Sequence, residues 1–212
     1  MIKRWSAVLL AAVVFGAAAP QASAEPEIPS NIYHWVQSTA RQNYYFNKDQ
    51  MRYGIDDEGN VDTNILIVPT LKTYDDVQIE DVTSKRRWKM QSVDGYRDLT
   101  GAADYYSFNV SEGTVTLLEH DDLNSSWGTL DQEIPETPQV ERLADFTAVD
   151  VDARFYRAIL FYAEDHADAI MANTDAELAR RGLTRGKVLL VKDKQDQTEK
   201  AATHHKRHHH DK

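Results

Sequence analysis

The chain has 212 residues, of which 42% are hydrophobic and 27% charged, and its formal net charge is −10. It contains no cysteine, which excludes disulfides, thiol catalysis and a lipid anchor on an N-terminal cysteine. The acidic balance argues against nonspecific binding to nucleic acid.

The first 24 residues have the composition of a secretory signal peptide. Lys3 and Arg4 precede an apolar run over residues 7–19, and residues 22–24 read Ala-Ser-Ala. The run is shorter than the roughly 20 residues that a membrane-spanning helix needs. We therefore expect cleavage before Glu25, a periplasmic or secreted location in a bacterium, and no membrane span after cleavage. Loss of the two cations takes the net charge to about −12.

The expected organisation after residue 24 is simple. Residues 25–30 contain two prolines and predict an extended leader, and residues 31–191 are expected to form a single domain. Within it, residues 32–37 and 44–46 mix β-branched and aromatic side chains, which is typical of strands.

A first β-hairpin is predicted next. The polar residues 56–60 separate apolar segments at 51–55 and 64–71, and Gly59 can supply the positive φ that such a turn requires. Pro69 lacks a backbone N–H, so it limits strand pairing on one side.

Residues 86–93 are predicted to form another strand. Alternation along it would place Trp88 in the core and Arg87 and Lys89 in water. The alternative is functional, because residues 85–89 are the one basic cluster of the folded part. Such a cluster could bind an anionic polymer, with Trp88 stacked on a sugar or base.

A second hairpin has the clearest strand pattern in the chain. Apolar and polar residues alternate over 106–110 and again over 114–117, and the turn between them ends at Gly113. Residues 131–138 contain two prolines and predict a loop.

The hydrophobic period changes from two to 3.6 after this loop. An apolar stripe over residues 151–172 predicts a long helix with Asp150 as its N-cap, and Thr174 is expected to begin a shorter helix. Residues 188–191 predict a closing strand. The fold class is therefore α+β, with an antiparallel β-meander of about five to seven strands packed against the long C-terminal helix.

The last segment, residues 192–212, is rich in Lys and His and has little to bury, which predicts a disordered tail. Neutral imidazole binds Zn²⁺, Ni²⁺ and Cu²⁺, so the tail is a candidate metal site, although Lys206 and Arg207 repel cations. No cofactor is required by any other motif. The predicted ligands are His204, His205, His208, His209 and His210.

Two other histidines are candidates for catalysis. His120 precedes Asp121 and Asp122, which suggests either an acid–base or metal group or, more simply, a solvated turn. His166 continues the stripe of the long helix, where a packed or boundary histidine is the simpler interpretation. A hydrolase would require both histidines to meet carboxylates in one pocket.

Several short motifs follow one another along the chain: Trp35, Tyr45-Phe46, Gly59, residues 65–71, Tyr106-Ser107-Phe108, Gly113 and Trp127. Their order resembles that of the small exported bacterial proteins typified by surface-adhesin protein E. The resemblance covers roughly residues 31–135 and implies a noncatalytic binding domain of the envelope, with no site residues carried over. The chain departs from that pattern in its long helix, its His-rich tail and its lack of cysteine.

The sequence thus favours an exported, noncatalytic protein that binds a ligand or a partner in the envelope or on a host, with a tail that binds transition-metal ions. One alternative is an exported hydrolase that uses carboxylates with His120 or His166. The other is a structural protein of the envelope. A binding protein predicts an apolar or aromatic concavity, whereas the structural protein predicts none.

Overall fold

The computed structural model describes residues 27–190. The predicted signal peptide (1–24), the first residues of the leader and the tail (192–212) lie outside the described residues. The strands are β1 (Tyr33–Ser38), β2 (Gln42–Asn47), β3 (Arg52–Ile55), β4 (Val61–Tyr74), β5 (Leu99–Asn109), β6 (Thr114–Asn124), β7 (Thr129–Glu133), β8 (Val140–Arg142) and β9 (Val188–Leu189). The helices are α1 (Asp76–Trp88), α2 (Val151–Asp165) and α3 (Ala167–Arg180).

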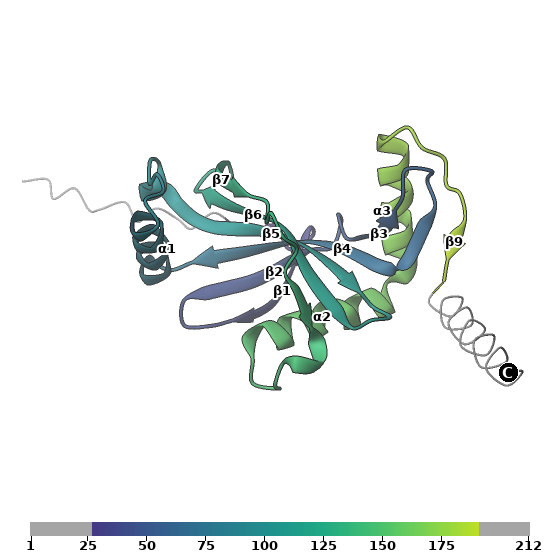
Figure 1. Cartoon of the computed structure of the whole chain (residues 1–212), viewed down its shortest axis with the longest axis horizontal. Coiled ribbons are helices and arrows are strands. Elements are labelled where there is room, and N and C mark those ends of the chain that lie inside the picture. Colours follow the sequence, from purple (N-terminus) through teal and green to yellow (C-terminus); the bar gives the residue numbers. More distant parts are fainter. Residues whose placement is uncertain (1–26, 191–212) are drawn as a thin grey trace, which may run out of the picture.

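The nine strands form one sheet, which confirms the α+β class but exceeds the expected five to seven strands. The main path runs β1-β2-β4-β5-β6-β7, with every pair antiparallel, and β3, β8 and β9 add to its edges. The short β9 pairs in parallel with the start of β4. The sheet is strongly twisted, with α1 at one end, α3 at the other and α2 across one face (Figure 1).

Both predicted hairpins are present. Gly59 (φ 82°) lies in the turn between β3 and β4, and Gly113 (φ 63°) lies in the turn between β5 and β6. Pro69 lies where β4 changes partners on one edge, because β3 pairs up to Ile67 and β2 pairs from Thr70. A residue without an N–H is tolerated in that gap. The predicted loop at 131–138 begins later than expected, since β7 extends to Glu133.

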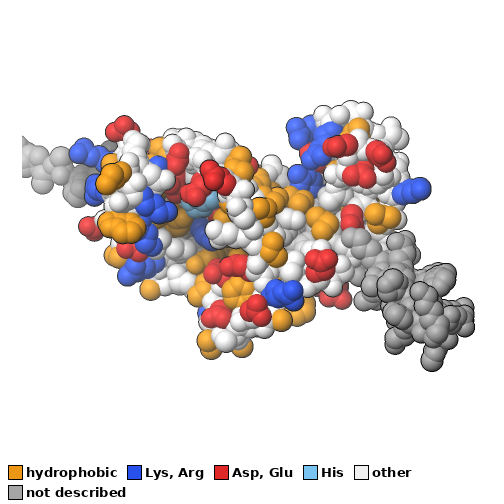
Figure 2. All heavy atoms as spheres, viewed as in Figure 1, with side chains coloured by type: hydrophobic (Ala, Val, Ile, Leu, Met, Phe, Trp, Pro, Cys, Tyr) orange, Lys and Arg blue, Asp and Glu red, His pale blue; other side chains and the backbone are white. Residues whose placement is uncertain are grey.

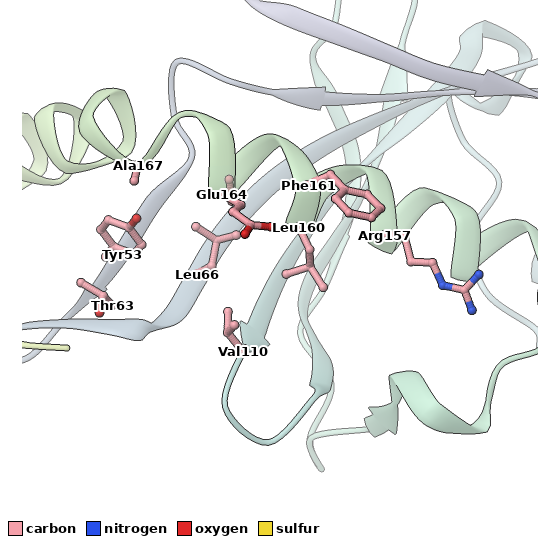
Figure 3. A pocket seen from close by; sticks show the side chains of 10 residues that line it. Tyr53, Thr63, Leu66, Val110, Arg157, Leu160, Phe161, Glu164 and Ala167 are labelled. Atoms are coloured by element: carbon pink, nitrogen blue, oxygen red, sulfur yellow. The ribbon is translucent and has the colours of Figure 1, made fainter. Parts of the chain in front are cut away.

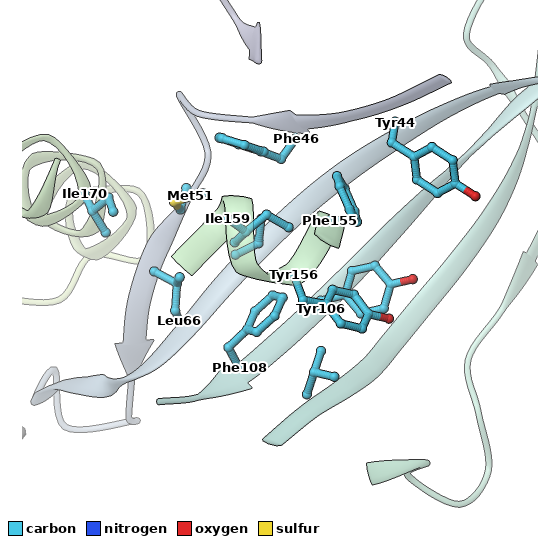
Figure 4. Packing of buried hydrophobic residues seen from close by; sticks show 12 residues of the cluster. Tyr44, Phe46, Met51, Leu66, Tyr106, Phe108, Phe155, Tyr156, Ile159 and Ile170 are labelled. Atoms are coloured by element: carbon cyan, nitrogen blue, oxygen red, sulfur yellow. The ribbon is translucent and has the colours of Figure 1, made fainter. Parts of the chain in front are cut away.

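The core lies between α2 and the sheet (Figure 4). Phe155, Tyr156 and Ile159 of α2 are almost completely buried. Tyr156 packs edge-on against Tyr106 and Phe108 of β5, with ring centroids 5.4 and 5.5 Å apart. Such aromatic contacts add about 1 kcal/mol each to the burial of apolar area. The apolar stripe predicted for this helix therefore faces the sheet as expected.

The prediction of a single long helix over residues 151–172 is wrong. The helix is interrupted at His166 (φ −123°, ψ 28°), and α3 then turns away from α2 toward β3 (Figure 1). Thr174 does not cap a further helix. It is buried within α3, where its hydroxyl donates to the carbonyl of Ile170 and accepts from the backbone N–H of Tyr53. The hydrogen bond from Tyr53 joins α3 to β3 and so stabilises the change in chain direction at His166.

The strand predicted at residues 86–93 is also wrong, because α1 extends to Trp88. The side chain of Asp75 accepts a hydrogen bond from the N–H of Gln78, which caps the helix. Three basic residues in the last turn, Lys85, Arg86 and Arg87, complement the helix dipole. Trp88 is consequently not in the core, and 85% of its surface is exposed.

None of the helices within residues 27–190 combines the length and the apolar character required to cross a bilayer.

Candidate functional site

A row of charged side chains crosses the sheet on the face that also carries the core. Thr70 of β4 pairs with Asp104 of β5, which pairs with His120 of β6. Paired residues of neighbouring strands point to the same face, and so do residues two apart along a strand. Lys72 and Asp122 therefore share this face with Asp104 and His120.

Asp104 is the buried centre of the row, with 2% of its surface exposed. Its carboxylate lies 2.8 Å from Nζ of Lys72 and 2.5 Å from Nδ1 of His120, and it accepts a hydrogen bond of 3.2 Å from the hydroxyl of Tyr106. Burial alone would raise the pKa of Asp104, but the two cations lower it more, so the pKa lies well below its usual range. Asp104 is therefore ionised at neutral pH.

His120 is held between two carboxylates. Its Nδ1 contacts Asp104, and its Nε2 lies 3.3 Å from Oδ1 of Asp122. Burial opposes the charged form, yet the hydrogen bonds to both carboxylates raise the pKa of His120 from 6.5 to about 10. The imidazole is protonated at neutral pH and donates from both nitrogens.

Asp122 connects this row to α1. It accepts a hydrogen bond of 2.6 Å from the hydroxyl of Tyr96 and lies 3.6 Å from the guanidinium of Arg86. Arg86 also forms an ion pair of 2.7 Å with Asp131 of β7, and its guanidinium lies over the ring of Tyr96. One arginine of α1 thus fixes the helix to two strands of the sheet.

The arrangement balances three cations against three carboxylates. A small pocket of about 180 Å³ borders on it. Because the protonated His120 has no free lone pair, it cannot accept a proton from a substrate or water. The cluster is suited to holding β4, β5, β6 and α1 together. Its charged members are Lys72, Arg86, His120, Asp104, Asp122 and Asp131.

The solvated turn suggested for residues 120–122 is wrong, since all three lie within β6. The hydrolase geometry is not formed by the two histidines either. His166 stacks on Tyr162, with ring centroids 3.9 Å apart, and Tyr162 packs against His34 of β1. His34 and His120 occupy one row of the sheet four strands apart, which corresponds to roughly 19 Å along the sheet.

Sequence reasoning missed Asp104 and Lys72, and it placed Arg86 in the basic cluster at 85–89 without connecting it to this row. A signal for the first was present, because Asp104 falls two and four residues before Tyr106 and Phe108 on the predicted buried face of the hairpin. A carboxylate on a core face requires buried cations as partners. These partners are Lys72 of β4 and His120 of β6, and Arg86 of α1 joins the row through Asp122. No local pattern identifies these pairings.

A second feature is an apolar cleft of about 600 Å³ beside α2 (Figure 3). On the sheet side it is lined by Leu66 and Val110, and on the helix side by Leu160 and Phe161. Leu160, Leu66 and Val110 point toward one another across the cleft (Figure 3). Phe161 is 68% exposed at this site, so a large aromatic ring is left in contact with solvent. We refer to this feature as the α2 cleft.

Polar groups are few around the α2 cleft. Tyr53 and Thr63 line one end, and Arg157 and Glu164 place one charge of each sign on the helix side. An apolar lining with a few polar groups is typical of sites for small molecules.

Among residues 27–190, no group of three or more His, Cys, Asp or Glu side chains is placed to hold a metal ion. The five predicted metal ligands of the tail lie outside the described residues. Comparison of the chain with protein-family models, with curated proteins and with solved structures finds no match. The resemblance to surface-adhesin protein E therefore stays a prediction.

Replacing His120 by Gln should destabilise the fold by about 2 kcal/mol, because two buried carboxylates lose a charged donor. The pKa of His120 is raised on folding, so its charge stabilises the fold fully below pH 6.5 and no longer does so once the pH rises through about 10. The difference in the free energy of unfolding between the two proteins should therefore be largest below pH 6.5 and should vanish as the pH approaches 10. Urea unfolding of both proteins across this range measures the difference.

The matched control is His166→Gln. That histidine is exposed, so the substitution should change stability by less than about 0.5 kcal/mol. A His120→Gln effect of the same size at pH 6 and at pH 10 would show that the charge of His120 is not what stabilises the fold.

Proposed function

We propose that this chain is an exported, noncatalytic protein of the bacterial envelope that binds a small apolar ligand in the α2 cleft. The observation that carries the proposal is the cleft itself, an apolar concavity of about 600 Å³ with an exposed phenylalanine at its rim. Ligand sites commonly have volumes of about 300–1,000 Å³. Export to the periplasm or the surface is supported by the composition of residues 1–24.

The construction of the cleft supports this role. One wall is α2, fixed to the sheet by the aromatic core, and the other is formed by β4 and by Val110 in the turn that follows β5. Leu66 is 1% exposed and belongs to the core, whereas Val110 is 44% exposed. The wall on the sheet side is therefore rigid at its base and accessible at its rim. Little conformational entropy has to be lost when a ligand binds there.

The hydrolase alternative receives less support. His120 is protonated and engaged with Asp104 and Asp122, and His166 lies beside the opposite part of the sheet. The envelope-structural alternative predicts no cleft and therefore does not account for the exposed Phe161.

Val110→Glu tests the ligand site. A carboxylate at the rim should weaken binding of the uncharged fluorophore N-phenyl-1-naphthylamine at least tenfold, because a charge would have to lose water against an apolar ligand. Fluorescence titration gives the dissociation constant, and an unchanged unfolding transition shows that the fold is intact.

Val149→Glu is the matched control, since Val149 is 80% exposed and does not line the cleft. It should leave the affinity unchanged. Equal affinities of the Val110→Glu and unaltered proteins, or no binding by the unaltered protein, would rule out the α2 cleft as a site for apolar ligands.

We further propose that the histidines of the tail bind a transition-metal ion, on the basis of ligand chemistry. Calorimetric titration of Zn²⁺, Ni²⁺ and Cu²⁺ should show micromolar or tighter binding to residues 25–212, to be lost in a chain that ends at Val191. Binding should also weaken below about pH 6, where the imidazoles become protonated. Binding that survives truncation, or no binding at all, would contradict this assignment.

A further inference from the structure

The C-terminus of α1 presents two large apolar side chains to solvent. Met90 is 95% exposed and Trp88 is 85% exposed, which makes them the two most exposed large hydrophobic residues between residues 27 and 190. Burial of apolar surface normally stabilises a fold. Because both side chains are exposed, they contribute no such stabilisation to the folded chain. They are two residues apart in the sequence, at the end of α1, which lies at one end of the molecule (Figure 1).

The backbone holds these residues in a defined turn. The N–H of Met90 donates to the carbonyl of Arg87, and the N–H of Gln91 donates to that of Arg86. This double pattern is a Schellman motif, in which the residue at the position of Met90 adopts the left-handed conformation. Met90 has φ 58°, a conformation that favours glycine and strains other residues. A strained, exposed methionine in place of glycine indicates a role outside the folding of the chain.

Positive charge flanks the two apolar residues in the sequence. Arg87 and Lys89 are exposed and form no ion pair with any residue of the described part of the chain. Lys85 is exposed and only loosely paired, at 3.6 Å, with Asp81, which Arg41 shares. Lys and Arg side chains gather over α1 in Figure 2, although the whole chain has a net charge of −10. We call the group of Lys85, Arg87, Trp88, Lys89 and Met90 the α1 corner.

We propose that the α1 corner is a contact site for the surface of a bilayer that contains anionic lipid. Trp88 and Met90 would enter the interfacial layer, and the three cations would lie against lipid phosphates. Tryptophan favours this layer because its ring is apolar and its N–H can remain hydrated. Basic side chains around an apolar tip are attracted by the negative surface potential of such a membrane. This inference is independent of the ligand proposed for the α2 cleft.

An anionic polymer is the competing partner, and the composition of the corner favours lipid over it. Trp88 could stack on a sugar or base, and the cations could contact a polyanion equally well. Met90 discriminates between the two, because a flexible thioether chain gains little from a hydrated polymer but is buried in an acyl layer. The attachment of α1 through Arg86 to Asp122 and Asp131 keeps the corner in a fixed orientation.

The test is vesicle flotation with residues 25–212, because the apolar signal peptide would itself bind lipid. The chain should bind vesicles that contain phosphatidylglycerol and should not bind vesicles of phosphatidylcholine alone. Tryptophan emission should shift to shorter wavelength on binding, and Trp88→Phe should remove most of that shift.

Two sets of variants identify the surface. Trp88→Ala with Met90→Ala should weaken vesicle binding at least tenfold, and Arg87→Gln with Lys89→Gln should weaken it about fivefold for each charge removed. Both pairs are exposed, so the fold should be retained, which circular dichroism checks. Trp35→Ala (55% exposed, on β1) and Arg154→Gln are the matched controls and should bind as tightly as the unaltered chain.

Two outcomes would overturn the proposal. One is vesicle binding that the Trp88 and Met90 substitutions leave unchanged, which would assign the contact to another part of the chain. The other is no vesicle binding together with retention on heparin that depends on Arg87 and Lys89, which would assign the corner to an anionic polymer.

Discussion

The buried carboxylate of Asp104 is the constraint on which the sheet depends. An ionised group with 2% exposure is stable only if charged and hydrogen-bonding partners replace water. Lys72 and His120 provide this from the two neighbouring strands, so β4, β5 and β6 must align in one register. A shift of any of these strands by one residue would turn its partner to the opposite face and leave Asp104 unpaired.

This constraint divides one face of the sheet into two regions. Under α2 the face is aromatic and apolar, and toward α1 it is charged and hydrogen-bonded. The apolar region extends beyond the core into the α2 cleft, whereas the charged region anchors α1 through Arg86. The proposed ligand site and the proposed membrane contact therefore belong to different helices, each fixed to the same sheet by a different kind of interaction.

The sequence predicted those parts of the fold whose signals are local. Gly59 and Gly113 mark the two hairpins, Pro69 marks the gap between β2 and β3, and the stripe of Phe155 and Ile159 marks the buried face of α2. Each depends on residues within about one turn or one strand of each other. The same information could not count the short edge strands, whose pairing depends on distant partners.

The errors have a common physical cause. α1 has no buried residue, so it lacks the apolar stripe that identifies a helix, and its N-cap and charges were the remaining signals. The break at His166 follows from packing of α3 on β3, including the hydrogen bond from Tyr53 to Thr174. The charged row joins residues as far apart in sequence as Lys72 and Asp131. Contacts of that range carry no local signature.

The most direct test of this account is the pKa of His120, measured by NMR titration of the imidazole protons. If two ionised carboxylates hold the ring, the midpoint lies near pH 10, and the ring is charged and structural at neutral pH. A midpoint at or below 6.5 would mean that the ring is neutral, that the row does not hold the sheet as described, and that His120 is available as a base.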